Sequence, residues 1–286
     1  MKNFWIRTAS ATIYAALFLG TMLSNRLLHN DILGTAIFAA FLIFVALGCT
    51  HEFYKISAMK GANPNRMIGG TFVFVVLALM AMATIGCLDY QPSWLMAPAA
   101  AMLLIAPVLL LLPFLLQLWG HSESPFADAA CTLVPIVYIA VPLGLMPFLH
   151  LKVNIMLMLL ILVWVNDSFA YMGGSLFGKH KLWQRHSPGK TWEGSICGLI
   201  FTVAVALFVG PLLNSSLLWY DWVVLAFICS VIDTLGDLLE SMLKRSVGLK
   251  DSGNVLPGHG GFLDRFDSLL VVVPFAFVYS LLILIR

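Results

Sequence analysis

Acidic side chains gather in the last third of this sequence, in a chain that otherwise carries little charge. Asp233, Asp237 and Glu240 are separated by four and three residues, so a helix would place all three on one face. Asp264 and Asp267 follow in the next polar stretch, three residues apart. Carboxylates of this kind bind Mg²⁺, and together with phosphate-binding cations they form sites for phosphoryl or nucleotidyl transfer.

Matching cations lie between these two acidic groups: Lys244, Arg245 and Lys250. His259 follows within the segment PGHGG, whose proline and glycines predict a tight turn that lets the backbone approach a ligand. A structural role in that turn and a catalytic role are equally compatible with this histidine.

Carboxylates at membrane depth are costly and therefore indicate function. Asp167, within NDSFAY, ends an apolar segment, and Asp237 lies near the end of another. Three acids on one helix face demand a partner cation, which favours a functional role for Asp237. For Glu240 we favour a polar helix end that reaches water.

A second polar segment, residues 173–193, contains the sequence SPGKT. Glycine N–H groups, the hydroxyls of Ser187 and Thr191 and the Lys190 ammonium can all bind phosphate oxygens. A P-loop ends in similar letters, but Gln184 replaces its first glycine and an apolar segment precedes it, so we exclude a Walker site. The cations of this segment could equally serve only to set the orientation of the protein, because Lys and Arg are enriched in cytoplasmic loops.

The composition is that of a membrane protein. Of 286 residues, 60% are hydrophobic and 10% are charged, against about 25% charged residues in soluble domains. The net charge of +2 is too small to indicate nucleic acid binding. A span needs about 20 apolar residues. Runs of this kind cover most of the chain, which predicts an all-α integral membrane protein with about nine transmembrane helices and one polytopic domain, 1–286. The predicted spans are 9–24, 32–49, 68–88, 94–118, 126–149, 153–172, 194–213, 222–241 and 266–285.

The distribution of Lys and Arg predicts the orientation. Nine spans place thirteen of the sixteen cations on the side of the N-terminus and three on the other side. Positive charge is enriched in cytoplasmic loops. The N-terminus and both polar segments are therefore expected in the cytoplasm and the C-terminus outside.

Residues 241–267 resemble the signature of the phosphatidate cytidylyltransferases, the CDP-diacylglycerol synthases, without a departure. The matching positions are Ser241, Lys244, Arg245, Lys250, Asp251, Gly253, Pro257, His259, Gly260, Gly261, Asp264, Arg265 and Asp267. NDSFAY, SPGKTWEG and GDLLES also resemble segments of this family, in the same order. The similarity extends from about residue 160 to the C-terminus, and it places the active site in about 160–268.

The resemblance implies that CTP and phosphatidate react to form CDP-diacylglycerol and pyrophosphate, with Mg²⁺ as cofactor held by Asp237 and Asp264. The implied catalytic residues are Asp237, Asp264, Lys244, Arg245, Lys250 and His259. The implied substrate-binding residues are Asp167, Ser187, Lys190, Thr191, Asp251, Gly260, Gly261, Arg265 and Asp267. Which segment binds phosphatidate and which binds CTP stays open, as does a homo-oligomer. The implied location is a bacterial plasma membrane, with the active site facing the cytoplasm.

Three other classes fit less well. A transporter would place acids near the bilayer midplane and show paired repeats with broken helices, whereas here the polar groups concentrate in two loops and the neighbouring helix ends. The CDP-alcohol phosphotransferases have an acidic motif of a different order, which is absent from this sequence. A scaffold leaves the charge pattern unexplained.

Reporter tags test the orientation. A tag at the N-terminus should be accessible only from the cytoplasm and a tag at the C-terminus only from outside, as protease protection of sealed vesicles would measure. Both termini on one side would contradict nine spans.

Overall fold

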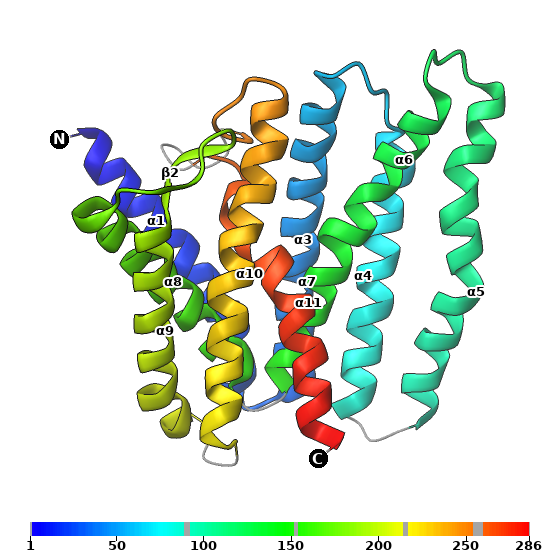
Figure 1. Cartoon of the computed structure of the whole chain (residues 1–286). Coiled ribbons are helices and arrows are strands. Elements are labelled where there is room, and N and C mark those ends of the chain that lie inside the picture. The colour runs from blue at the N-terminus through cyan, green and yellow to red at the C-terminus, as the bar shows by residue number, and fades with distance from the viewer. Residues whose placement is uncertain (1, 89–91, 152–153, 214–216, 254–259, 286) are drawn as a thin grey trace. The chain divides into compact units, whose positions relative to one another are not determined.

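The computed structural model describes residues 2–88, 92–151, 154–213, 217–253 and 260–285. Helices account for nearly all of these residues, which confirms the all-α class (Figure 1). The elements are α1 (Lys2–Met22), α2 (Ser24–Leu28), α3 (Asp31–Ala58), α4 (Arg66–Leu88), α5 (Pro92–Leu116), η1 (Gln117–Trp119), α6 (Pro125–Pro135), η2 (Ile136–Ala140), α7 (Val141–Leu151), α8 (Ile155–Phe177), β1 (Lys181–Trp183), β2 (Ser187–Thr191), α9 (Trp192–Leu213), α10 (Trp219–Ser246) and α11 (Leu263–Ile285).

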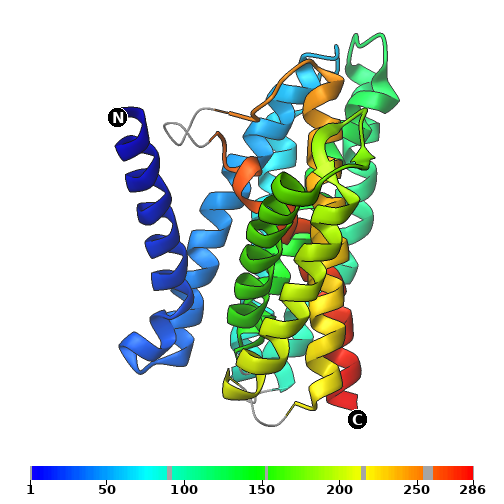
Figure 2. The ribbon, with the colours of Figure 1, turned by 60° about the vertical axis from the view of Figure 1, so that its left-hand side comes forward.

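Among the described residues, eight helices are long and apolar enough to cross a membrane. They correspond to the second to ninth predicted spans. The first predicted span, 9–24, falls in α1, whose described apolar part, Thr12–Met22, is shorter than a full span. Helix α1 is joined to α3 through the short α2. From there the axes of α1 and α3 diverge toward the N-terminal end of α1 (Figure 2).

The predicted span 126–149 is an interrupted helix. A π-helical turn, η2, separates α6 from α7, and Pro135 lies directly before it. Pro142 follows this turn. A proline lacks the N–H that would donate to the carbonyl four residues earlier, and its ring crowds that carbonyl, which here belongs to Tyr138 within η2.

The chain divides into two compact units. The first comprises Met1–Pro147 and Asp251–Arg265, and the second comprises Phe148–Lys250 and Phe266–Arg286. The first unit thus contains α1 to α6 and the start of α11, and the second contains α8, the two strands, α9, α10 and most of α11. The prediction of one polytopic domain stays a prediction.

A buried carboxylate organises one end of the first unit. Asp128 accepts hydrogen bonds from the Asn63 backbone N–H at 2.6 Å and from the Ser122 hydroxyl at 2.5 Å. One turn later on α6, the Thr132 carbonyl accepts a hydrogen bond from the Tyr54 hydroxyl at 2.8 Å. Buried polar groups require such partners, so α6 ties the α3–α4 connection to the segment that follows η1.

Glycines bring α8 and α9 together in the second unit. A Cβ at Gly194 would lie 2.6 Å from the Ala170 carbonyl oxygen, and one at Gly198 would lie 2.7 Å from Oδ1 of Asn166. Neither position therefore tolerates a side chain. Membrane helices approach closely through small residues of this spacing. The spacing of these two glycines is explained by helix packing.

Candidate functional site

The polar segment 173–193 is more ordered than a loop. Helix α8 continues to Phe177, and β1 and β2 then form an antiparallel two-stranded hairpin. Lys181 lies opposite Thr191 in this hairpin. The residues SPGKT are strand β2, so their backbone is extended rather than wrapped as in a P-loop.

The hairpin is anchored to the start of α9. The Glu193 carboxylate accepts hydrogen bonds from the backbone N–H groups of Lys179 and His180, each at 3.2 Å. It also contacts Nδ1 of His180 at 2.6 Å. The Thr191 hydroxyl accepts a hydrogen bond from the Gly194 N–H, as a capping side chain does at a helix start. These contacts hold β2 beside the helix that follows it.

Five predicted site residues line one polar cavity of about 470 Å³ in the second unit. They come from α8, β2 and α10: Asp167, Ser187, Lys190, Thr191 and Asp237. Segments that are separated by tens of residues thus converge on one space, as a binding site requires.

An ion pair crosses this cavity. Nζ of Lys190 lies 2.6 Å from Oδ2 of Asp237, and it also donates to the Thr234 carbonyl at 3.4 Å. Both charged side chains are about one quarter to one third exposed, at 25% and 32%. Lys190 is therefore the partner cation that the acidic face of α10 demands, and solvent still reaches the pair.

Two pairs of carboxylates lie in the same unit. Asp167 and Asp233 are within hydrogen-bonding distance of each other, and so are Asp237 and Asp267. Two carboxylates in contact repel each other unless a proton or a cation lies between them. The second pair includes one predicted metal ligand, Asp237, and one predicted substrate-binding residue, Asp267.

These oxygen donors suit Mg²⁺. The part of the chain that the structure describes contains no group of three or more His, Cys, Asp or Glu side chains arranged to hold a metal. Magnesium does not need such a group, because it is commonly bound by one or two carboxylates, with waters and substrate phosphates completing its shell. Asp237, which lines the cavity, and the neighbouring Asp267 provide two such carboxylates.

Asn166 was not among the predicted site residues. Its amide donates to Oδ2 of Asp233 at 2.6 Å, and its Oδ1 accepts from the Ser230 hydroxyl at 2.8 Å. All three side chains are buried. The amide links α8 to α10 through these hydrogen bonds. The sequence feature that could have identified Asn166 is its position directly before Asp167, within an otherwise apolar segment.

Glu52 was also missed, and it organises the signature segment. This α3 residue is buried, with 3% of its surface exposed. Its carboxylate accepts hydrogen bonds from the Phe262 and Leu263 N–H groups at 2.9 Å and from the Ser252 hydroxyl at 2.8 Å. A Cβ at Gly261 would overlap both Glu52 oxygens. The place of Glu52 three residues beyond the predicted span 32–49 gave no distinct sequence signal.

Asp264 has a similar anchoring contact. Its Oδ2 accepts hydrogen bonds from the N–H groups of Ser252 and Gly261, each at 2.8 Å. Gly260 has a positive φ of 80°, and a Cβ there would overlap the same oxygen. Only glycine fits such a position without strain. Asp264 belongs to the first unit and Asp237 to the second, so their joint binding of a metal stays a prediction.

The expectation that Glu240 reaches water is wrong. Glu240 is 1% exposed, and its Oε2 lies 2.5 Å from Nζ of Lys244. The two residues are four apart on α10, so they share a helix face. Lys244 covers the acid and compensates its charge. This predicted phosphate-binding lysine therefore has a carboxylate partner.

The other predicted cations and signature residues lie nearer the surface. Arg245 is exposed and donates to the backbone carbonyl four residues later. Lys250 and Asp251 are exposed, and Arg265 is half-buried. His259 lies outside the described residues. The roles predicted for these five residues stay predictions.

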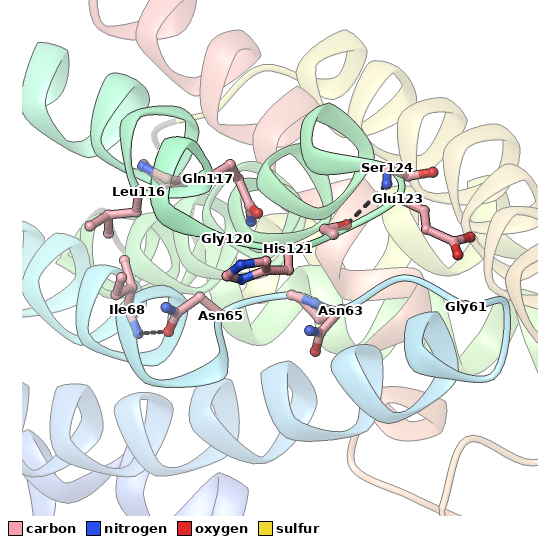
Figure 3. A pocket seen from close by; sticks show the side chains of 13 residues that line it. Gly61, Asn63, Asn65, Ile68, Leu116, Gln117, Gly120, His121, Glu123 and Ser124 are labelled. Atoms are coloured by element: carbon pink, nitrogen blue, oxygen red, sulfur yellow. Dashed lines mark hydrogen bonds between the residues drawn. The ribbon is translucent and has the colours of Figure 1, made fainter.

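A second polar cavity, of about 620 Å³, lies in the first unit, where α4 begins and α5 and η1 end. Its walls include Asn63, Asn65, Gln117, His121 and Glu123, several of which appear in Figure 3. Asn65 is occupied in accepting the Ile68 N–H. None of the predicted site residues lines this cavity.

Comparisons with known proteins agree on one family. The model of the cytidylyltransferase family matches residues 5–283. A phosphatidate cytidylyltransferase of Staphylococcus saprophyticus is 32% identical over 272 residues, which cover 94% of this chain and 96% of the relative. One from Staphylococcus aureus strain COL is 32% identical over 278 residues, with the same coverage. One from Staphylococcus haemolyticus is 42% identical over 162 residues, which cover 54% of this chain and 60% of that protein.

Glu52→Gln should loosen the segment that Glu52 anchors. The change removes the charge from three hydrogen bonds, each worth about 1.5–3 kcal/mol when one partner is charged. We expect faster hydrogen exchange at the Phe262 and Leu263 amides and a lower midpoint of thermal unfolding. Glu123→Gln, at an exposed position, is the matched control. Unchanged exchange at both amides would contradict the anchoring role.

Proposed function

The chain belongs to the cytidylyltransferase family, and from this premise we propose that it transfers the cytidylyl group of CTP to phosphatidate. The products are CDP-diacylglycerol and pyrophosphate, so the protein is a nucleotidyltransferase of phospholipid biosynthesis. The observation that supports this most directly is the family match over residues 5–283. The Lys190–Asp237 cavity supplies a cation and hydroxyls for phosphate within such a chain.

The reaction joins two anions. A phosphate oxygen of phosphatidate attacks the α-phosphorus of CTP, a new P–O bond forms, and the bond from that phosphorus to the bridging oxygen breaks. The electron pair leaves with pyrophosphate. A phosphomonoester is already charged at neutral pH, so a strong general base is unnecessary. Positioning and charge neutralisation then supply most of the catalysis.

Residues of the hairpin and of α10 are proposed to perform that neutralisation. An entering phosphate competes with Asp237 for the Lys190 ammonium, which lies in the shared cavity. The Ser187 hydroxyl donates to the same phosphate. Lys244, Arg245 and Lys250, which follow on α10 and just after it, are proposed to neutralise further phosphate oxygens. The Lys244 ammonium has three donors, so it can bind substrate while it stays paired with Glu240.

Asp237 is proposed to hold Mg²⁺ with Asp264, as the resemblance implies, and contact between its carboxylate and that of Asp267 makes Asp267 a third candidate ligand. When bound, the metal supplies positive charge to the CTP phosphates. In its absence, Lys190 compensates Asp237. Either Mg²⁺ or the Lys190 ammonium thus compensates the negative charge of Asp237, so this carboxylate is never left without a cation.

The membrane location suits the lipid substrate. Phosphatidate can keep its acyl chains in the bilayer while its phosphate meets CTP at the surface. The positive-inside bias supports a site that faces the cytoplasm, where CTP is found. The bacterial relatives support the plasma membrane as its location.

Lys190→Ala tests the proposed function together with its phosphate contact. Purified protein in mixed micelles should convert labelled CTP and phosphatidate into a labelled lipid. Removing the ammonium should lower this rate by about 10²–10³-fold, as loss of a transition-state charge contact does. Lys181→Ala, on the exposed strand β1 of the same hairpin, should have little effect. A labelled lipid that never forms would refute the function, and equal losses in both variants would refute the specific contact.

Asp237→Asn tests the metal. The change keeps the size of the side chain and removes its charge, so most activity should be lost and the remaining activity should need more Mg²⁺. The measurement is initial rate against Mg²⁺ concentration, with Asp31→Asn, at the exposed start of α3, as control. Asp264→Asn and Asp267→Asn, each alone and combined with Asp237→Asn, assign the second ligand. Two residues that hold the same metal act as a unit, so the double variant should be little less active than the less active single variant. A folded Asp237→Asn protein with unaltered Mg²⁺ dependence would contradict the assignment.

A further inference from the structure

An apolar groove lies beside the polar cavity in the second unit. It has a volume of about 320 Å³ and runs between α9 and α10, which are neighbours in both views (Figures 1 and 2). Ile196 and Leu199 line it from α9, and Val231, Leu235 and Leu238 line it from α10. None of the residues that line it is charged. A groove of this kind suits hydrocarbon.

The groove adjoins the cation-containing cavity. Ser195 and Thr234 line both spaces. Lys190 donates to the backbone carbonyl of Thr234 and so lies at their junction. An occupant of both spaces must therefore have an anionic end and an apolar end. A phosphorylated lipid has this chemistry and CTP does not.

Two tryptophans line the groove near the hairpin. Trp183 belongs to β1, and Trp192 begins α9. Tryptophan side chains favour the level of lipid headgroups. At about 1.5 Å per residue, Ile196 and Leu199 lie roughly 6 and 10 Å farther along α9 than Trp192. The groove thus runs from the headgroup level toward the hydrocarbon, as an acyl chain does.

Apolar side chains on both helices of the groove are exposed. Ile196 is 53% exposed and Leu235 is 51% exposed. Both lie on helices that are long and apolar enough to span a membrane. A lipid can therefore reach the groove from the bilayer without first entering water.

We propose that this groove holds an acyl chain of phosphatidate while Lys190, Ser187 and Thr191 hold its phosphate. The inference rests on the proposed function and deepens it, because it assigns the lipid substrate to the hairpin side of the site. CTP is then bound by the other cations, which follow on α10 and in the signature segment. In this arrangement the hairpin binds the phosphate headgroup of the lipid.

Filling the groove tests the assignment. Leu235→Trp should raise KM for dioleoyl phosphatidate about tenfold, the scale of an apolar misfit in a binding pocket. It should change KM for CTP less than twofold, and it should affect dihexanoyl phosphatidate less than the dioleoyl lipid. Leu239→Trp is the matched control, since Leu239 is also an exposed leucine of α10 but does not line the groove. Ile196→Trp and Ile200→Trp repeat the comparison on α9.

Lys190→Ala addresses the headgroup. Its residual activity should show a raised KM for both phosphatidates and an unchanged KM for CTP. A raised KM for CTP alone would overturn the assignment and give the hairpin to the nucleotide. Equal effects of Leu235→Trp and Leu239→Trp on the dioleoyl lipid would also overturn it, since that result indicates bulk bilayer contact or an interface between copies of this chain.

A binding measurement separates this inference from the proposed function. Phosphatidate with a photoreactive group in its acyl chain should label peptides containing 192–199 and 231–238, and excess unlabelled dioleoyl phosphatidate should suppress the labelling. Labelling without any CDP-diacylglycerol from the unmodified protein would support the groove and refute the reaction. Turnover without labelling at these peptides would support the reaction and refute the groove.

Discussion

The contact between Lys190 and Asp237 is the interaction on which the rest of the second unit depends. It joins a strand to α10, at a helix position that would otherwise leave a carboxylate beside other carboxylates. Charges near the hydrocarbon are retained only when they are paired or hydrated. The glycines of α8 and α9 and the capping contacts of Glu193 make sense as supports for this pair, because they bring β2 to the depth at which Lys190 reaches the acid.

Buried carboxylates serve two different purposes in this chain. Glu52 and Asp128 accept hydrogen bonds from backbone N–H groups and hydroxyls, so their charge is used to fix loops. Asp237 has a side-chain partner instead, the ammonium of Lys190. A carboxylate whose donors belong to the backbone cannot easily change partners, whereas one that faces a side-chain cation beside a cavity can. Asp264, a proposed metal ligand, also accepts hydrogen bonds from backbone N–H groups, so this difference alone does not separate anchoring acids from candidate site acids.

A lipid nucleotidyltransferase must bring a hydrocarbon-bound anion and a water-soluble anion to one place. The second unit has the two adjoining environments that this task requires, a cation-containing cavity and an apolar groove between α9 and α10. Because the lysine lies at their junction, the lipid would be held by its phosphate at the same point where its chains leave water. Within the first unit, Glu52 anchors the start of α11.

Sequence alone determined the helical class, eight of the spans and the family, and it named Asp237 and Lys190 as candidate site residues. Long apolar runs and closely spaced signature residues are local features, so composition and order suffice to recognise them. Tertiary structure decided what lies far apart along the chain. Glu52 meets Phe262 across 210 residues, Lys190 meets Asp237, and β2 and the groove arise from packing. Hydropathy says that a segment is buried in a membrane, but it does not say which partner compensates a charge there, because that partner is chosen by three-dimensional contact.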